Sequence, residues 1–218
     1  MSTTLLEEYI ESGNGPAIED LLNSNPKLAS ALTSHQMTPL LLSCYYNKPQ
    51  LARLFIKHLD QVLLHEAAGV GLLDTVMEYV ERDQQIVNSI SSHGFSVLGI
   101  ASHFGKEDIV RYLLSKHADP NLPSQNGYQV YPIHAAVTAG YLSIAKLLVE
   151  VGAEVNVLQT ARITPLHLAA QRGDIDTIIL LLEQGAMVEI QNDYGQTASD
   201  VAQENGFVEI AGILKTYA

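Results

Sequence analysis

The sequence is poor in cysteine and in aromatic residues. Tryptophan is absent, aromatic side chains make up 6% of the 218 residues, and cysteine occurs once, at Cys44. A single cysteine excludes an intrachain disulfide, and we expect Cys44 to be a buried small apolar residue. The alternative, a reactive thiol, requires an electropositive and exposed surrounding, of which the sequence gives no sign.

Basic residues are also scarce. The chain has 12 Lys and Arg against 24 Asp and Glu, which gives a net charge of −12. Binding to nucleic acid depends on Lys and Arg contacts with phosphate, so this balance argues against it. The charge is compatible with a basic protein partner, and a requirement for solubility explains it equally well.

Long apolar segments are missing. No apolar run approaches the roughly 20 residues that a membrane-spanning helix needs. The N-terminus lacks the charged segment followed by an apolar one that marks a secretory signal. We therefore expect a soluble cytoplasmic protein that acts as a monomer and has no contact with a membrane.

The chain does contain a repeated seven-residue pattern. It reads T-P-L-H-L-A-A at Thr164–Ala170, and weaker copies are spread along most of the chain. The copies begin at residues 38, 62, 96, 131, 164 and 197, so successive starts lie 24, 34, 35, 33 and 33 residues apart. A period of about 33 residues indicates an array of repeats, each built from two short helices and a turn.

Each residue type in the strongest copy has a physical role. Thr164 can cap the first helix by accepting backbone N–H groups, and Pro165 fits the first helical turn, where its missing N–H costs nothing. Ala169 and Ala170 are small enough to let neighbouring helices pack closely. Gly173 is expected to end the helix in a left-handed conformation.

On these residues the chain resembles the ankyrin-repeat family over almost its whole length. The resemblance implies an all-α solenoid of about seven stacked helix-turn-helix pairs, joined by short β-hairpin loops called fingers. We expect a single ankyrin-repeat domain over residues 1–218, with repeats at 3–36 (N-terminal cap), 37–60, 61–95, 96–130, 131–163, 164–196 and 197–218 (C-terminal cap). The outer face of the N-terminal cap should be polar, a role that acidic residues such as Glu7 fit.

Three irregularities interrupt the pattern. The short spacing between the first two copies predicts that His58–Asp60 joins two helices directly, so that one finger is missing near residues 58–61. Bacterial ankyrin-repeat proteins have a similar truncated junction ahead of an E-A-A motif, here Glu66–Ala68. The loop Asp119–Val130 is longer than the pattern and predicts an enlarged finger. Arg162 replaces the usual glycine, so that turn should differ in shape.

Short segments that look like catalytic or cofactor-binding motifs each lack an essential part. His65-Glu66 begins like the zinc motif H-E-x-x-H but has no second histidine, and one ligand cannot hold a catalytic zinc. Gly69-Val70-Gly71 has two glycines of a dinucleotide loop, but it ends a helix and follows no strand. No pair of carboxylates stands out as acid and base. We therefore expect no enzyme activity, no cofactor and no metal.

Three of the eight histidines, His65, His134 and His167, share the fourth position of the pattern. The family resemblance implies that this histidine hydrogen-bonds the backbone of a neighbouring loop. The alternative, a metal or acid–base site, lacks ligand-like spacing among the remaining histidines.

The resemblance places partner binding on a concave groove formed by fingers and first helices. The two residues before the end of each first helix should face the groove, and Tyr and Arg are favoured at binding hot spots. The candidate contact residues are Tyr45, Tyr46, His103, Phe104, Tyr128, Tyr131, Gln171, Arg172, Asn192 and Tyr194.

The predicted function is a protein–protein interaction scaffold for an unidentified protein partner. An alternative for the candidate residues is that their rings pack on one another and bind nothing. An alternative function is an inhibitor or immunity-type regulator that uses the acidic surface against a basic protein.

Overall fold

The computed structural model describes residues 2–217, and all regular elements within them are helices. The only β-type pairing in this range consists of two isolated antiparallel bridges. The chain divides into two compact units, residues 1–82 (unit 1) and residues 83–218 (unit 2). The predicted all-α fold is confirmed.

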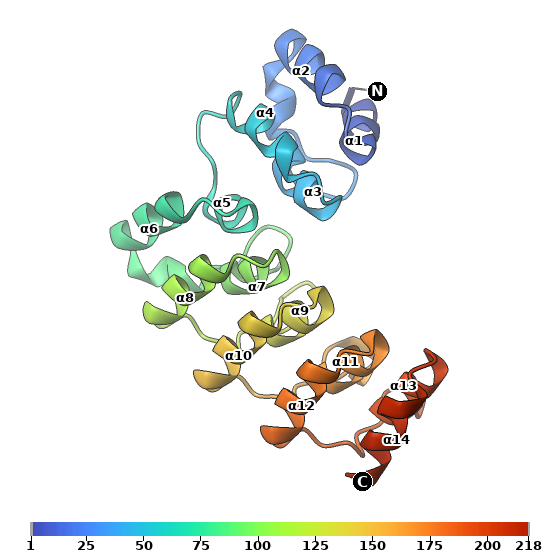
Figure 1. The fold of residues 1–218 in the computed structure, drawn as a ribbon. Coiled ribbons are helices and arrows are strands. Elements are labelled where there is room, and N and C mark those ends of the chain that lie inside the picture. The colour runs from blue at the N-terminus through green and yellow to red at the C-terminus, as the bar shows by residue number, and fades with distance from the viewer. Residues whose placement is uncertain (1, 218) are drawn as a thin grey trace. The chain divides into compact units, whose positions relative to one another are not determined.

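Unit 1 is a stack of helix pairs (Figure 1). Its helices are α1 (Ser2–Ser12), α2 (Gly15–Ser24), α3 (Pro39–Tyr45), α4 (Ala52–Ile56), α5 (Leu64–Val70) and α6 (Leu73–Arg82), with the 3-10 helices η1 (Pro26–Ser30) and η2 (Pro49–Leu51). The first helices α1, α3 and α5 pack in that order, and α2 packs against α4. The core between them holds almost completely buried side chains such as Ile10, Leu22, Leu40 and Phe55.

Unit 2 continues the same pattern of helix pairs. Its helices are α7 (Val97–His103), α8 (Glu107–Ser115), α9 (Pro132–Ala139), α10 (Leu142–Glu150), α11 (Pro165–Arg172), α12 (Ile175–Glu183), α13 (Ala198–Glu204) and α14 (Val208–Thr216), with the 3-10 helices η3 (Gln84–Asn88) and η4 (Thr160–Arg162). The first helices α7, α9, α11 and α13 pack side by side, while α8, α10 and α12 form a second row. Fully buried alanines in the first helices permit this close packing: Ala101, Ala136, Ala169 and Ala202. With unit 1, the described residues form the expected seven pairs.

The ends of the first helices follow the predicted local signals. The hydroxyl of Thr164 accepts the backbone N–H of His167 at 3.2 Å, and Pro165 occupies the first turn of α11. Gly173 ends that helix with φ of 67°. After α3 the glycine is replaced by Asn47, which adopts the same left-handed conformation with φ of 54°.

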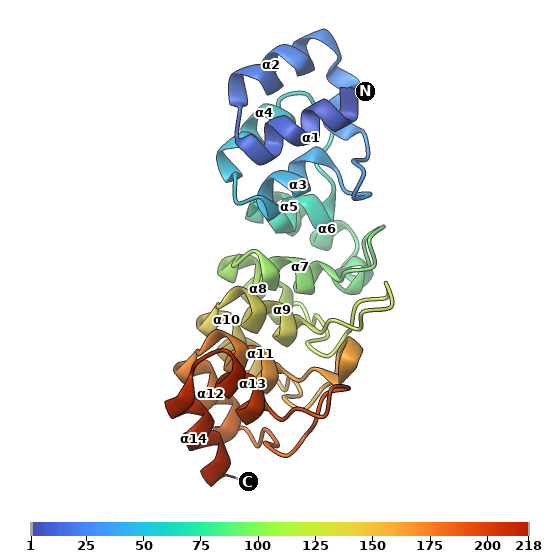
Figure 2. The ribbon, with the colours of Figure 1, turned by 90° about the vertical axis from the view of Figure 1, so that its right-hand side faces the viewer.

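The fingers are turns that precede first helices, and in each one the N–H of the first residue donates to the carbonyl of the last. In unit 2 they lie together on one side of the helices (Figure 2). The closing pairs are Thr33–Met37 (2.8 Å), Ser91–Phe95 (2.8 Å), Ser124–Val130 (2.9 Å), Gln159–Ile163 (3.0 Å) and Asn192–Gln196 (2.9 Å).

The three predicted irregularities of the fingers are confirmed. The finger that Ser124 and Val130 close spans two more residues than the other four. In the finger that precedes α11, Arg162 and its neighbour Ala161 both have positive φ, which gives this turn its own shape. Between α4 and α5 the chain runs from Ile56 to Leu64 without a finger.

Helix α5 begins one residue later than the pattern predicts. Leu63 precedes the helix in an extended conformation, and the carboxylate of Glu66 accepts its backbone N–H at 2.8 Å. Glu66 therefore takes the helix position that His134 and His167 hold in α9 and α11. The predicted equivalence of His65 with those two histidines is wrong, because the capping carboxylate sets the start of the helix.

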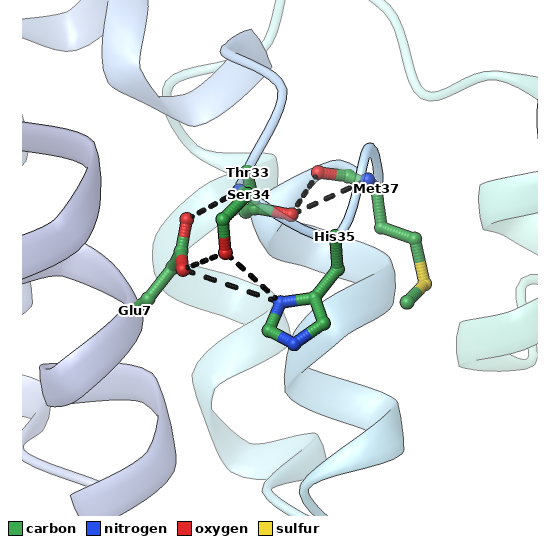
Figure 3. A network of polar contacts seen from close by, with 5 residues as sticks. All are labelled: Glu7, Thr33, Ser34, His35 and Met37. Carbon is green, nitrogen blue, oxygen red and sulfur yellow. Dashed lines mark hydrogen bonds and ion pairs between the residues drawn. The ribbon is translucent and has the colours of Figure 1, made fainter.

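A second correction concerns Glu7, which was expected on a solvent-facing cap. Its side chain is only 14% exposed and points at the finger that Thr33 and Met37 close, where it accepts hydrogen bonds from Ser34 (Figure 3). A carboxylate that receives two donors stabilises this loop.

Candidate protein-binding surface

The fingers of unit 2 are joined to one another by backbone hydrogen bonds. The N–H of Gln125 donates to the carbonyl of Gly94 at 2.6 Å, that of Thr160 to Tyr128 at 2.9 Å, and that of Asp193 to Ala161 at 3.0 Å. Each bond connects one finger to the finger of the preceding repeat. The fingers therefore form a continuous row with a fixed backbone, which is a suitable support for side chains that contact a partner.

Two buried histidines fix the first helices to this row. Nε2 of His134 lies 3.0 Å from the carbonyl of Ile163, and Nε2 of His167 lies 3.0 Å from the carbonyl of Gln196. In both residues Nδ1 accepts the N–H of the residue that precedes the helix, so Nε2 carries the proton and donates it. The role that the family resemblance implied for these two residues is confirmed.

The same burial makes both histidines weak bases. Burial lowers the pKa of His134 to about 4, against the raising effect of its hydrogen bonds to backbone. The pKa of His167 is lowered for the same reason. Both rings are thus neutral at physiological pH, which preserves the donor and acceptor pattern that holds the fingers.

Two of the predicted contact residues project from the row into solvent. Tyr128 is 61% exposed and Tyr194 is 78% exposed. Asn192 behaves differently, since it is only 6% exposed and its Oδ1 accepts the N–H groups of Tyr194 at 2.9 Å and Gln196 at 3.0 Å. Asn192 thus shapes the finger and positions Tyr194 rather than offering its own amide to a partner.

A hollow of about 220 Å³ lies between this finger, α11 and α13. It brings together three predicted residues, Gln171, Asn192 and Tyr194, with Glu204 and Asn205 from the end of α13. Two of its lining residues, Gln171 and Glu204, are exposed to solvent. A single side chain of a partner can enter a space of this kind.

The other predicted residues at the ends of first helices pack on their neighbours. The guanidinium of Arg172 lies over Gly140 and donates to the carbonyl of Thr138 at 3.0 Å. His103 and Phe104 are half-buried, with their ring centroids 4.9 Å apart in an edge-to-face arrangement. These side chains therefore help to shape the surface, in addition to any contact they make with a partner.

The remaining candidates differ in exposure. Tyr131 is half-buried, with its ring centroid 5.6 Å from that of His134. In unit 1, Tyr45 is 41% exposed, while Tyr46 packs against the core. Tyr45 is therefore the aromatic candidate that unit 1 presents to solvent.

Two residues that shape this surface were not found from the sequence. Tyr141 lies over Gly105, and Phe207 lies over Gly173, in the space that a side chain on each glycine would need. Each ring comes directly after the glycine that ends its own repeat's first helix. That position, read across repeats, is the signal that identifies them.

Residues 2–217 contain neither a candidate metal site nor a candidate membrane-spanning helix. No three His, Cys, Asp or Glu side chains come together in an arrangement that could hold a metal ion. Within the same range, none of the helices combines the length and the apolar character required to cross a lipid bilayer.

Comparison with known proteins agrees with this geometry. The family model described as ankyrin repeats (three copies) matches residues 6–124, 64–159 and 133–218. The chain is 31% identical over 147 residues to ankyrin repeat and SAM domain-containing protein 6 of Rattus norvegicus, which covers 67% of the chain and 14% of that protein.

Two shorter similarities involve proteins with other names. The chain is 38% identical over 64 residues to the DNA-binding protein RFXANK of Homo sapiens, covering 29% of the chain and 25% of that protein. It is 38% identical over 100 residues to the nuclear factor NF-kappa-B p105 subunit of Gallus gallus, covering 45% of the chain and 10% of that protein. The chain thus spans a quarter or less of these relatives.

Proposed function

Because the chain belongs to the ankyrin-repeat family, whose repeats are generally protein–protein interaction modules, we propose that it binds a protein partner through the fingers of unit 2. The observation that carries this proposal is the exposure of Tyr128 and Tyr194, at 61% and 78%, on a row of hydrogen-bonded fingers. Both rings lie outside the core, where a partner can reach them, and tyrosine is enriched at binding hot spots.

The physical advantage of this arrangement lies in its low entropy cost. Tyrosine buries a large area while only two side-chain torsions are fixed, and the fingers beneath it are already ordered before binding. Tyr194 stands next to the hollow that Gln171 and Glu204 line, so one partner residue can enter the hollow while its neighbour stacks on the ring.

The other candidates have secondary roles in this proposal. Arg172, His103 and Phe104 border the binding surface of unit 2 and keep its shape, and Tyr131 supports the finger that carries Tyr128. In unit 1, Tyr45 is proposed to add a contact, while Tyr46 packs against the core of that unit. The proposed partner is a protein rather than a nucleic acid, since a net charge of −12 opposes contact with phosphate. We further propose that the chain acts as a monomer and has no catalytic role.

Alanine substitution of Tyr128 and Tyr194 tests the proposal. A partner captured from the native host would be purified, and its affinity measured for the unaltered chain and for the double variant. We expect affinity to fall by about tenfold or more, because such rings act as hot spots, while the thermal midpoint stays nearly unchanged. Tyr217→Ala is the matched control, since Tyr217 is 63% exposed but lies after the last helix.

Two outcomes would contradict the proposal. If the double variant bound the partner as tightly as the unaltered chain, the two finger tyrosines of unit 2 would not be part of the binding surface. A loss of affinity with rising salt, unaffected by either tyrosine, would instead favour an inhibitor that covers a basic protein with its acidic surface.

A further inference from the structure

A second hollow, of about 420 Å³, lies within unit 1 at the place where the finger between α4 and α5 is absent. Its walls come from η1, from the residue before α3, from the segment that joins α4 to α5, and from the first turn of α5. The residues that line it include Lys27, Thr38, Asp60, Leu63 and Glu66. A volume in this range is typical of sites that hold a ligand or an inserted segment.

In the complete repeats of this chain, the corresponding position before the first helix is occupied by a finger. In unit 2, each of the three later fingers bonds to the preceding finger through backbone groups, as Gln125 does with Gly94 and Asp193 with Ala161. In unit 1, the finger closed by Thr33 and Met37 has the same closing hydrogen bond as those in unit 2. The direct connection from α4 to α5 supplies no finger to follow it. The hollow is therefore the space of a missing turn.

The hollow is lined by more acidic than basic side chains. Glu66 is 5% exposed and lies at its wall, where one carboxylate oxygen caps α5 by accepting the N–H of Leu63 at 2.8 Å. Asp60 is exposed at the same hollow, and Lys27 is its one lysine or arginine. His58 completes the titratable groups that face the space. Two carboxylates against one ammonium leave a negative balance that a basic side chain complements.

We propose that this hollow binds a turn segment of a partner protein that carries an arginine. The turn replaces the missing finger, and the guanidinium approaches the carboxylates of Asp60 and Glu66. Arginine fits better than lysine because its planar group can bond two carboxylates or one carboxylate with two parallel bonds. Leu63 and the adjacent apolar atoms of the lining cover the stem of the side chain.

This site is separate from the fingers of unit 2 and does not rest on the function proposed for them. The residues of the two surfaces do not overlap. Variants of Asp60 and Glu66 therefore test this inference alone, whereas variants of Tyr128 and Tyr194 test the other.

The experiment uses the full chain and a defined probe. The probe is a library of disulfide-closed turn peptides with one fixed arginine, and the comparison library carries citrulline, which has the same shape without the charge. Binding is followed through the backbone amide resonances of the isotope-labelled chain. We expect members of the arginine library to shift the resonances of Gln61, Leu63 and Glu66, and members of the citrulline library to leave them in place.

Variants of the chain make the test specific. Asp60→Asn and Glu66→Gln should each weaken binding of the selected peptide by about tenfold. Glutamine at position 66 can still accept the N–H of Leu63, so α5 keeps its cap. Copying residues 186–196 between Asp60 and Gln61 restores a finger and should abolish binding. Gln171→Ala, in the hollow of unit 2, is the control and should leave binding unchanged.

Three results would overturn the inference. The first is an arginine library without any member that shifts these resonances. The second is equal binding of the citrulline peptides, which would remove the role of the carboxylates. The third is a finger-restored chain that still binds the selected peptide as tightly as the unaltered chain.

Discussion

Ser34 donates two hydrogen bonds to the carboxylate of Glu7, one from its backbone N–H and one from its hydroxyl. The N–H lies 2.6 Å from Oε1 and the hydroxyl lies 2.5 Å from Oε2, while Nδ1 of His35 lies 4.0 Å from Oε2 (Figure 3). Burial opposes ionisation, but the bonds from Ser34 and the charge of His35 outweigh it, so the pKa of Glu7 lies below its ordinary value. An ionised carboxylate on α1 thus anchors the first finger.

Removing this carboxylate should destabilise the chain. We expect Glu7→Ala to lower the free energy of unfolding by about 1 kcal/mol, the lower end for bonds to a charged group because the pair lies near solvent. The contribution is present above the ordinary pKa of glutamate and disappears as pH falls through the lower pKa of the folded chain. Urea unfolding at pH 7 and at acid pH measures both effects. Glu8→Ala is the control, since Glu8 is exposed, and an equal loss in the two variants would contradict the anchoring role.

The buried imidazole of His134 makes stability depend on pH in a higher range. Its pKa is about 4 in the folded chain and 6.5 when exposed, so between these values the unfolded chain binds a proton that the folded chain does not. Stability should therefore be complete above pH 6.5 and decline toward pH 4, by about 3 kcal/mol in total.

Thermal unfolding between pH 7 and pH 4.5 measures this decline. His134→Gln should lower stability at pH 7 and reduce the slope with pH. His117→Asn controls for the removal of an exposed imidazole. An unchanged slope in the His134 variant would show that other groups cause the acid sensitivity.

Much of the fold could be predicted from the sequence because its signals are local. Thr164 and Gly173 mark the ends of a helix through residue types that suit those positions, and no distant contact is needed to recognise them. The missing finger near residues 58–61 and the enlarged finger within 119–130 follow from counting residues between copies of the pattern. Chain length between two fixed helices leaves little freedom for the connecting loop.

The predictions that failed or were incomplete concern contacts that no local rule specifies. Glu7 meets Ser34, which lies 27 residues away, and no periodicity relates the two positions. The start of α5 shifts by one residue because Glu66 can cap it, although the pattern of apolar residues is satisfied either way. Asn192 looks like an exposed turn residue in the sequence, yet its side-chain amide is hydrogen-bonded within the finger.

Replacing Gly173 by alanine has two costs, overlap with the ring of Phe207 and strain of the left-handed backbone, and comparison with Gly185 separates them. Gly173 has φ of 67°, and a methyl group there would overlap the ring, whereas Gly185 has φ of 80° and no atom within 4 Å of the same position. We expect Gly185→Ala to destabilise by about 1 kcal/mol, from the left-handed backbone alone. Gly173→Ala should cost at least about 1 kcal/mol more, because the ring must move.

Denaturant unfolding of both variants, and of Gly173→Ala combined with Phe207→Ala, measures the difference. The combined variant should lose less than the sum of the two single losses, since the overlap disappears with the ring. Equal losses at Gly173 and Gly185 would show that Phe207 adapts without strain.

The finger before α11 offers a stabilising substitution. Ala161 and Arg162 have φ of 62° and 55°, a combination that asparagine and glycine adopt with less strain than alanine and arginine. Replacing the pair by Asn-Gly should raise the free energy of unfolding by about 1 kcal/mol. The bond that Ala161 accepts from the N–H of Asp193 uses a backbone carbonyl, so the substitution preserves it.

Arg162→Lys is the matched control, because lysine keeps the charge and the strained backbone, and its thermal midpoint should stay close to that of the unaltered chain. A lower thermal midpoint in both the Asn-Gly variant and the Arg162→Lys variant would contradict the predicted stabilisation. It would mean that the hydrogen bond from the guanidinium of Arg162 to the carbonyl of Gln191, at 3.4 Å, contributes more than the turn geometry. In that case the hydrogen bond of the Arg162 side chain would offset the strain that arises from its positive φ.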